Sequence, residues 1–239
     1  MSPKVLILGI GNVLWADEGF GVRCVEVMAE THALPDTVRL LDGGTQGLYL
    51  LPFLEEAEAL IVFDAIDYGL PPGTMKIVRD GEVPAFMGAK KMSLHQTGFQ
   101  DVIATAQLMG YCPARMVLIG CQPVELDDYG GGLRPEVAAR IPEALAIARG
   151  ILAEWDVPVA EGRTESDLLA DPAIRRAAYE AGRPSESEAW RSGDDRFFPR
   201  AAPHPAGAPQ PEAAPSPLVG EGWGGGATAP AATPPGGTA

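Results

Sequence analysis

The sequence is poor in the features that mark secreted and membrane-spanning proteins. It has only three cysteines among 239 residues, Cys24, Cys112 and Cys121, and their wide spacing argues against a disulfide framework or a CxxC pair. No apolar run reaches the roughly 18 residues that a membrane span requires. The first residues show no charged region followed by an apolar stretch and a cleavage site. We therefore expect a cytoplasmic protein without membrane insertion.

Basic residues are also scarce. The chain carries 18 Lys and Arg against 32 Asp and Glu, which gives a formal net charge of -14. Residues 1–159 hold 21 acidic and 11 basic residues, a net of -10, so most of the acidity lies in the part with a folded composition. Because affinity for a phosphate backbone depends on clustered Lys and Arg, we expect no nucleic-acid partner. An acidic surface is compatible with a protein partner that carries a basic patch.

The motifs of common hydrolases and cofactor enzymes are missing too. The sequence contains no G-x-S-x-G elbow and no H-E-x-x-H pair. Gly9–Gly11 begins like a dinucleotide fingerprint, but Leu14 stands where the third glycine is required. Asp17 and Glu18 would also place negative charge where a pyrophosphate binds. Cys112 has no histidine near it in sequence, and the other two cysteines fall in a helix and a strand pattern, so a thiol protease is not favoured.

What the sequence does contain is an alternation of short apolar strands and amphipathic helices. Buried strands are predicted at residues 4–9, 38–41, 59–63 and 116–120, with an alternating edge strand at 74–78. Helices are predicted at residues 19–30, 46–54 and 99–109, and a last one that ends near Trp155 and is kinked or restarted at Pro142. This order predicts an α/β fold, with a mostly parallel sheet covered by helices on both faces.

The composition changes after Val159. Residues 1–159 form the predicted α/β domain, and residues 160–200 form a charged C-terminal extension with one helix between Asp171–Pro172 and Gly182. Residues 201–239 contain nine prolines, no Lys or Arg and only three large apolar residues. Such a segment buries too little apolar surface to offset the entropy of ordering, so we expect a disordered Pro/Ala/Gly-rich tail.

Polar side chains stand beyond the carboxyl ends of the predicted strands, where parallel α/β sheets bind ligands. Glu18 follows the first strand, Asp64 ends the third, and His95 lies in the loop before the helix at 99–109. Two carboxylates and an imidazole that converge could bind a divalent transition metal and leave coordination positions open. The local sequence also allows structural roles: a helix cap or macrodipole partner for Asp17 or Glu18, an acceptor of backbone amides for Asp64, and a capping or surface histidine for His95. Spacing alone does not show that the three side chains converge.

A fourth polar residue, Asp42, precedes a pair of glycines after the second strand. The glycines favour a strand-to-helix turn in which the Asp42 carboxylate bonds to backbone amides. A contact between Asp42 and a substrate is the alternative interpretation.

Taken together, four blocks of sequence resemble the [NiFe]-hydrogenase maturation protease family. They are G-x-G-N-x-L-x-x-D-E-G-x-G at residues 9–21, D-G-G-T-x-G at 42–47, D-A at 64–65 and H-Q-x-G at 95–98. The similarity covers about residues 3–157, and the segment through about Arg200 is similar to the longer ends of members that serve uptake hydrogenases. The tail after Ala201 departs from the family.

The resemblance implies an α/β fold with a five-stranded sheet and a metal position made by a Glu, an Asp and a His, which match Glu18, Asp64 and His95. It implies an endopeptidase that cuts the hydrogenase large-subunit precursor once, near its C-terminus, after nickel insertion. The implied metal is therefore nickel carried by the precursor, which is the expected partner. The predicted catalytic residues are Glu18, Asp64 and His95, with Asp42 as a supporting polar contact.

Three alternatives stay open on the sequence. A nickel-sensing chaperone that binds the precursor without cleaving it would use the same three ligands. A general metallopeptidase would hold its own ion tightly and cut unrelated peptides. A structural α/β scaffold with capped helices would leave the four polar blocks unexplained.

Overall fold

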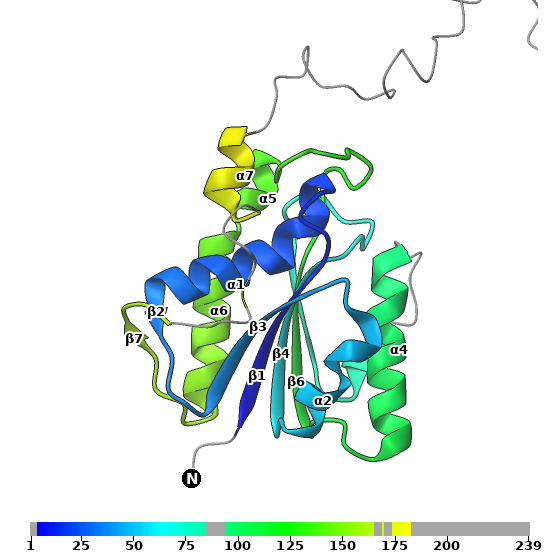
Figure 1. Ribbon diagram of the computed structural model, residues 1–239, viewed down its shortest axis with the longest axis vertical. Helices are drawn as coiled ribbons and strands as arrows, with labels where there is room; N and C mark the ends of the chain where they lie inside the picture. Colours follow the sequence, from blue (N-terminus) through cyan, green and yellow to red (C-terminus); the bar gives the residue numbers. More distant parts are fainter. Residues whose placement is uncertain (1–3, 85–93, 165–168, 170–173, 183–239) are drawn as a thin grey trace, which may run out of the picture. The chain divides into compact units, whose positions relative to one another are not determined.

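The computed structural model describes residues 4–84, 94–164, 169 and 174–182. All of them belong to one compact unit, Met1–Arg191, which is distinct from Ser192–Ala239. A five-stranded sheet lies at the centre of this unit, with helices on both of its faces (Figure 1). The predicted α/β architecture is therefore confirmed. The tail predicted to be disordered, residues 201–239, lies outside the described residues.

The sheet has the strand order β3-β1-β4-β6-β5, and β5 runs antiparallel to its neighbour while the other pairs are parallel. Its strands are β1 (Val5–Ile10), β3 (Val38–Gly44), β4 (Ala59–Ala65), β5 (Met75–Arg79) and β6 (Arg115–Cys121). Every residue of β1 and β4 is buried, as their continuous apolar sequences predict, whereas β5 at the edge is mostly accessible. A short pair, β2 (His32–Ala33) with β7 (Ala160–Glu161), was not predicted, because two-residue strands carry no periodicity.

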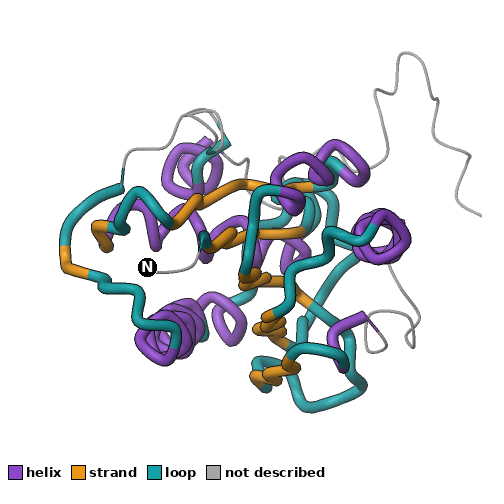
Figure 2. The backbone as a smooth tube through the Cα atoms, turned by 90° about the horizontal axis from the view of Figure 1, so that it is seen from below, coloured by secondary structure: helices purple, strands orange, loops and turns teal. Residues whose placement is uncertain are grey.

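Helices and single turns cover the two faces. They are η1 (Ala16–Gly19), α1 (Phe20–Thr31), η2 (Gly47–Leu50), α2 (Leu51–Glu55), α4 (Leu94–Met109), α5 (Pro135–Ala138), α6 (Ile141–Glu154) and α7 (Arg176–Gly182). The long helices α1 and α6 lie on one face, and α2 and α4 lie on the other (Figure 1, Figure 2). No helix among the described residues is long and apolar enough to cross a membrane.

The alternation of side chains along each strand creates two separate cores. In β4, Ile61 and Phe63 point into the core beneath α1 and α6, whereas Leu60 and Val62 point into the core beneath α2 and α4. The same alternation continues to the end of each strand. This alternation therefore determines the face of the sheet to which each polar side chain at the edge points.

Several element boundaries differ from the prediction in a way that matters for the site. The strands β3 and β4 continue through Asp42 and Asp64, because ladder pairing with neighbouring strands extends past the last apolar residue. The helix α4 begins at Leu94, so His95 lies in its first turn and not in a preceding loop.

Two predicted helices are also changed in detail. Pro142 stands in the first turn of α6, where its missing N–H has no partner to lose, so the helix restarts there and is not kinked. The helix predicted in the C-terminal extension is α7, which includes Gly182 as its last residue.

Two glycines allow the start of α1 to rest on the carboxyl edge of the sheet. A Cβ atom on Gly21 would collide with the carbonyl oxygens of Ile10 and Phe63. Gly11 has a φ of 126°, a conformation that favours glycine, and a Cβ there would overlap the carbonyl oxygen of Glu18. The backbone of η1 and α1 therefore contacts the ends of β1 and β4 directly, and it brings Glu18 to this edge.

We expect Gly21→Ala to lower the free energy of unfolding by about 3 kcal/mol, since the added methyl group has only backbone atoms to displace. Gly150→Ala is the matched control, because Gly150 is an exposed α6 residue with nothing within 4 Å of an added Cβ. It should raise the stability by about 0.5–1 kcal/mol. Urea unfolding of both variants measures the difference. Equal effects of the two substitutions on stability would show that the packing of α1 does not depend on its close approach to the strand ends.

Candidate functional site

The carboxyl edge of the sheet has a switch point between β1 and β4. From β1 the chain passes through α1 to β3 on one side, and it then returns through α2 to β4 on the other side. Parallel α/β sheets bind ligands in the crevice at such a point. Glu18 in η1 and Asp64 in β4 flank it, and both are buried, with exposed fractions of 8% and 1%. The structure therefore places two predicted site carboxylates at the same edge of the sheet.

The Asp64 side chain points to the face of the sheet that α4 covers. It alternates in phase with Leu60 and Val62, which belong to the core beneath α4. His95 occupies the first turn of α4, the helix on this same face. The structure describes the backbone of His95 but not its side chain, so convergence of His95 on Asp64 stays a prediction. Among the side chains that the structure does describe, no three His, Cys, Asp or Glu residues form a group that could hold a metal ion.

The Asp42 side chain points to the opposite face of the sheet. In the β1–β3 ladder Asp42 pairs with Gly9, whose missing side chain would point at Gly21 and Val25 of α1. Paired residues in a parallel ladder share a face, so the Asp42 carboxyl is directed toward α1. The structure thus separates Asp42 from the face of Asp64, and its role as a supporting contact stays a prediction.

The Asp42 carboxyl is electrostatically perturbed. Burial raises its pKa to about 6; a hydrogen bond from the Gly44 backbone opposes the rise, the charge of Glu26 adds to it, and the charge of Arg23 opposes it. Its Oδ1 atom accepts no hydrogen bond from a described residue. The group therefore changes protonation near neutral pH.

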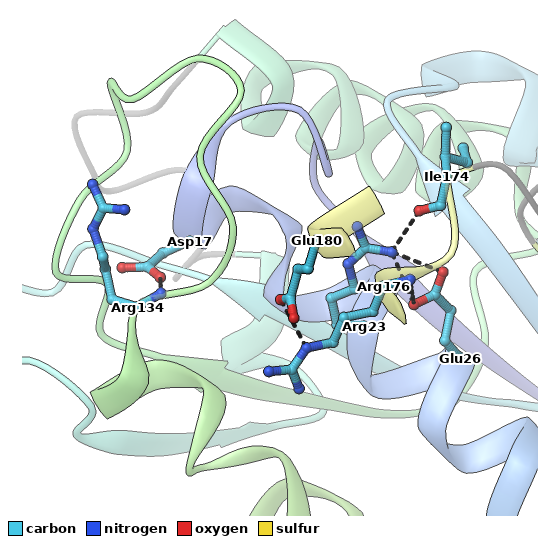
Figure 3. Close-up of polar contacts among 7 residues, drawn as sticks. All are labelled: Asp17, Arg23, Glu26, Arg134, Ile174, Arg176 and Glu180. Carbon is cyan, nitrogen blue, oxygen red and sulfur yellow. Dashed lines mark hydrogen bonds and ion pairs between the residues drawn. The ribbon is translucent and has the colours of Figure 1, made fainter. Parts of the chain in front are cut away.

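Asp17 has a structural role that the sequence did not reveal. Its Oδ2 atom accepts the backbone N–H groups of Val124 at 2.8 Å and Glu125 at 3.0 Å, and Oδ1 accepts that of Arg134 at 2.7 Å (Figure 3). It is completely buried, and η1 has no side-chain cap hydrogen bond, so the predicted capping role is wrong for Asp17. Asp17 instead holds the loop after β6 against η1, beside Glu18. Its partners lie more than a hundred positions away, so local sequence carries no sign of them.

Gln122 holds a second loop in the same manner. Its Oε1 atom accepts the backbone N–H groups of Tyr68 at 2.7 Å and Leu70 at 3.1 Å, and its Nε2 atom donates to Asp67 at 2.9 Å. Only 5% of Gln122 is exposed. The loop after β4 is therefore fixed to the end of β6. Neither Gln122 nor Tyr68 belongs to a sequence motif. Their contact becomes visible only in the structure, where the register of the sheet brings the two loops together.

The three cysteines lack the lowered pKa of a reactive thiol. Burial raises the pKa of Cys24 well above its ordinary value, raises that of Cys121 to about 12, and raises that of Cys112. Each therefore stays a protonated thiol near neutral pH. The assignment of Cys24 and Cys121 as packing residues is confirmed by their complete burial in the core beneath α1.

The C-terminal extension packs on α1 through a buried ion pair. Arg23 Nη1 lies 2.9 Å from Glu26 Oε1 and donates to the carbonyl oxygen of Ile174 at 2.7 Å (Figure 3). The ring of Tyr179 lies 5.7 Å from the guanidinium carbon of Arg23. Residues 174–182 are therefore part of the folded unit and lie against the first turns of α1.

Comparisons with known proteins agree with this architecture. The sequence profile of a family described as hydrogenase maturation protease matches residues 22–151. The chain is 74% identical over 199 residues to the hydrogenase expression/formation protein HupD of Rhodobacter capsulatus. The alignment covers 83% of this chain and 95% of that relative. It is 42% identical over 155 residues to the hydrogenase 2 maturation protease of Escherichia coli strain K12, over 64% of this chain and 93% of the relative.

A solved structure shows the same fold. The hydrogenase maturating endopeptidase HybD from E. coli matches with a TM-score of 0.63 and 41% identity, over 66% of this chain and 97% of that chain.

The raised pKa of Asp42 makes stability depend on pH. Between the ordinary value of 3.8 and about 6, the folded state binds more protons than the unfolded state, so this group lowers the free energy of unfolding as pH rises through that window. Asp42→Asn removes the titration. Relative to wild type, we expect the variant to gain stability across the window, by at most about 3 kcal/mol, and to keep a constant difference at higher pH.

Urea unfolding of wild type and variant between about pH 4 and pH 8 measures this difference. Asp36→Asn, which replaces an exposed carboxyl at a position outside the site, is the control. An Asp42→Asn difference independent of pH would show that the Asp42 carboxyl is not desolvated.

Proposed function

The chain belongs to the hydrogenase maturation protease family and is an endopeptidase, and on this premise we propose that it removes the C-terminal extension of a nickel-loaded [NiFe]-hydrogenase large-subunit precursor. The nickel is part of the substrate and is recognised by Glu18, Asp64 and His95. The observation that carries the proposal is the burial of Glu18 and Asp64 on either side of the switch point between β1 and β4. The cytoplasm stays the expected location.

The donor set suits an ion that arrives with the substrate. Carboxylate oxygens and imidazole nitrogen are ligands that borderline divalent ions accept. Three protein donors leave coordination positions for the ligands that the precursor itself supplies and for water. The burial of Glu18 and Asp64 excludes bulk solvent, which strengthens the attraction between these carboxylates and a cation. The enzyme therefore has no need of a fourth side chain or of a tightly held ion of its own.

Hydrolysis requires a water molecule that loses a proton and a leaving amine that gains one. Glu18 or Asp64, as a carboxylate, can accept the proton from a water positioned at the scissile carbonyl and can then give that proton to the leaving amine. The nickel of the precursor supplies Lewis acidity and aligns the scissile bond relative to these groups. Asp42 is proposed to support the site from the α1 face of the sheet, beside the buried Arg23–Glu26 pair.

The same three groups would serve a chaperone that senses nickel without cutting. Family membership favours the endopeptidase, because the matched relatives are named proteases and endopeptidases. A change in the covalent mass of the precursor separates the two functions directly.

We expect Glu18→Gln, Asp64→Asn and His95→Gln each to slow cleavage of nickel-loaded precursor by roughly 100-fold or more, since each removes a metal donor or a proton acceptor. Intact-mass spectrometry of the precursor, with and without the chain, measures the loss of one C-terminal peptide. Asp127→Asn is the control, because Asp127 is an exposed carboxylate in the loop after β6, and it should leave the rate unchanged.

A precursor without nickel serves as the second control and should stay intact. Cleavage of both precursor forms would refute recognition through nickel. Binding without any loss of mass would instead favour the chaperone. Normal rates for the three site variants would show that the active site lies elsewhere.

A further inference from the structure

The exposed apolar side chains of the folded unit gather at one edge of the sheet. Eight large apolar side chains are exposed among the residues that the structure describes, and five of them follow the carboxyl ends of the strands. These five, termed the apolar rim, are Leu48 and Tyr49 after β3, Leu70 after β4, and Val124 and Tyr129 after β6. Exposed apolar residues that are scattered singly are common, whereas residues gathered in one region mark an interaction surface.

The apolar rim borders the switch point on both sides. The strand order is β3-β1-β4-β6-β5, so the two rim residues after β3 stand on the β1 side of the switch point and the other three on the β4 side. The loops after β4 and β6 lie beside η1 at the upper end of the sheet in Figure 1. Glu18 and Asp64 therefore lie between the two parts of the rim.

An aromatic anchor stands on the β4 side. Tyr129 is 64% exposed, and its ring centroid lies 5.2 Å from that of Trp15 in an edge-to-face arrangement. An antiparallel bridge joins the backbones of the same two residues, and the Trp15 carbonyl accepts the Glu18 N–H at 2.9 Å. The aromatic pair is therefore one turn away from Glu18 and is held in place before any partner binds. Tyrosine and tryptophan in such fixed positions contribute strongly to protein interfaces.

A second anchor, Tyr49, stands on the β1 side and is 82% exposed. Its turn is fixed from within, because the Gln46 N–H donates to the carbonyl oxygen of Gly43 at 3.1 Å and Gln46 Nε2 donates to that of Asp42 at 3.0 Å. Gly47 supplies the positive φ of 56° that the turn requires. The site thus has an exposed and pre-positioned tyrosine on each side.

The surroundings of the apolar rim are acidic. The loops after β4 and β6, residues 66–74 and 122–134, hold four acidic residues and one basic residue. The basic residue, Arg134, is ion-paired with Asp128 at 2.8 Å. A partner that covers the rim therefore needs basic groups around an apolar centre, because further carboxylates would meet like charge.

From this distribution we infer that the apolar rim is the docking surface for the large-subunit precursor, through a precursor face with apolar side chains at its centre and Lys or Arg around them. Contacts on both sides of the switch point hold the precursor so that its C-terminal segment enters between Glu18 and Asp64. The identity of the partner rests on the proposed function. The rim itself makes no contact with nickel, so the precursor should dock with or without the metal.

Docking is tested first by the Kd of the full chain for nickel-free precursor, measured by isothermal titration calorimetry. Tyr49→Ser and Tyr129→Ser should each raise the Kd roughly 10-fold. Leu108→Ser is the matched control, since Leu108 is 88% exposed at the end of α4 that leads to the start of β6, and its Kd should equal that of wild type. Urea unfolding of each variant verifies that it is folded. Wild-type Kd values for both tyrosine variants would overturn the inference.

The consequence for turnover is tested on nickel-loaded precursor. Tyr49→Ser and Tyr129→Ser should raise KM roughly 10-fold and leave kcat unchanged, because the rim binds the precursor equally well before and during the reaction. Added salt should raise the Kd of the wild type, since it screens the attraction between the acidic loops and the basic border of the precursor. A Kd that does not depend on salt would refute that border.

The outcomes separate docking from the proposed function. A wild type that binds the precursor through the rim but removes no peptide would refute the endopeptidase and leave the docking surface in place. Cleavage with an unchanged KM in both tyrosine variants would refute the docking surface and leave the endopeptidase. A loss of kcat without a rise in KM would also overturn docking, because it would assign the tyrosines to the chemical step.

Discussion

The contact between the backbone of α1 and the carboxyl ends of β1 and β4 is the constraint on which the site depends. It exists because Gly21 has no Cβ to meet the carbonyl oxygens of Ile10 and Phe63. Because the start of α1 lies this close to the strand ends, η1 ends directly above the sheet and Glu18 is buried at the switch point. A helix displaced outward by one methyl group would carry Glu18 away from Asp64, which stays fixed in the β4 ladder.

Two buried polar side chains fix the loops around this contact. Asp17 accepts three backbone N–H groups from the loop after β6, and Gln122 joins the loop after β4 to the end of β6. Buried carboxylates and amides are stable only when they are hydrogen-bonded, so each side chain and its loop stabilise one another. Of the two adjacent acidic residues, Asp17 therefore holds structure, whereas Glu18 is the one proposed to bind the nickel of the substrate.

The sheet also separates Asp64 and Asp42, which the sequence analysis assigned to one site. Asp64 and Tyr68 lie on the face covered by α4, whereas Asp42 lies on the face covered by α1, near the buried Arg23–Glu26 pair. That pair also contacts the C-terminal extension, so residues 174–182 are coupled to the α1 face and not to the α4 face. The carboxyl groups at one edge therefore have different surroundings, and the raised pKa of Asp42 follows from its own burial.

The sequence by itself determined the fold class and the family, and it supplied the candidate site carboxylates. The apolar runs of β1 and β4 and the periodicity of α1 come from local patterns that burial imposes, and the blocks around Glu18 and Asp64 are contiguous in the chain. Only the tertiary structure decided the task of Asp17, the face of Asp42 and the contact of Gln122 with Tyr68. The physical reason is that these depend on strand register and on hydrogen bonds between residues more than fifty positions apart, which no local pattern encodes.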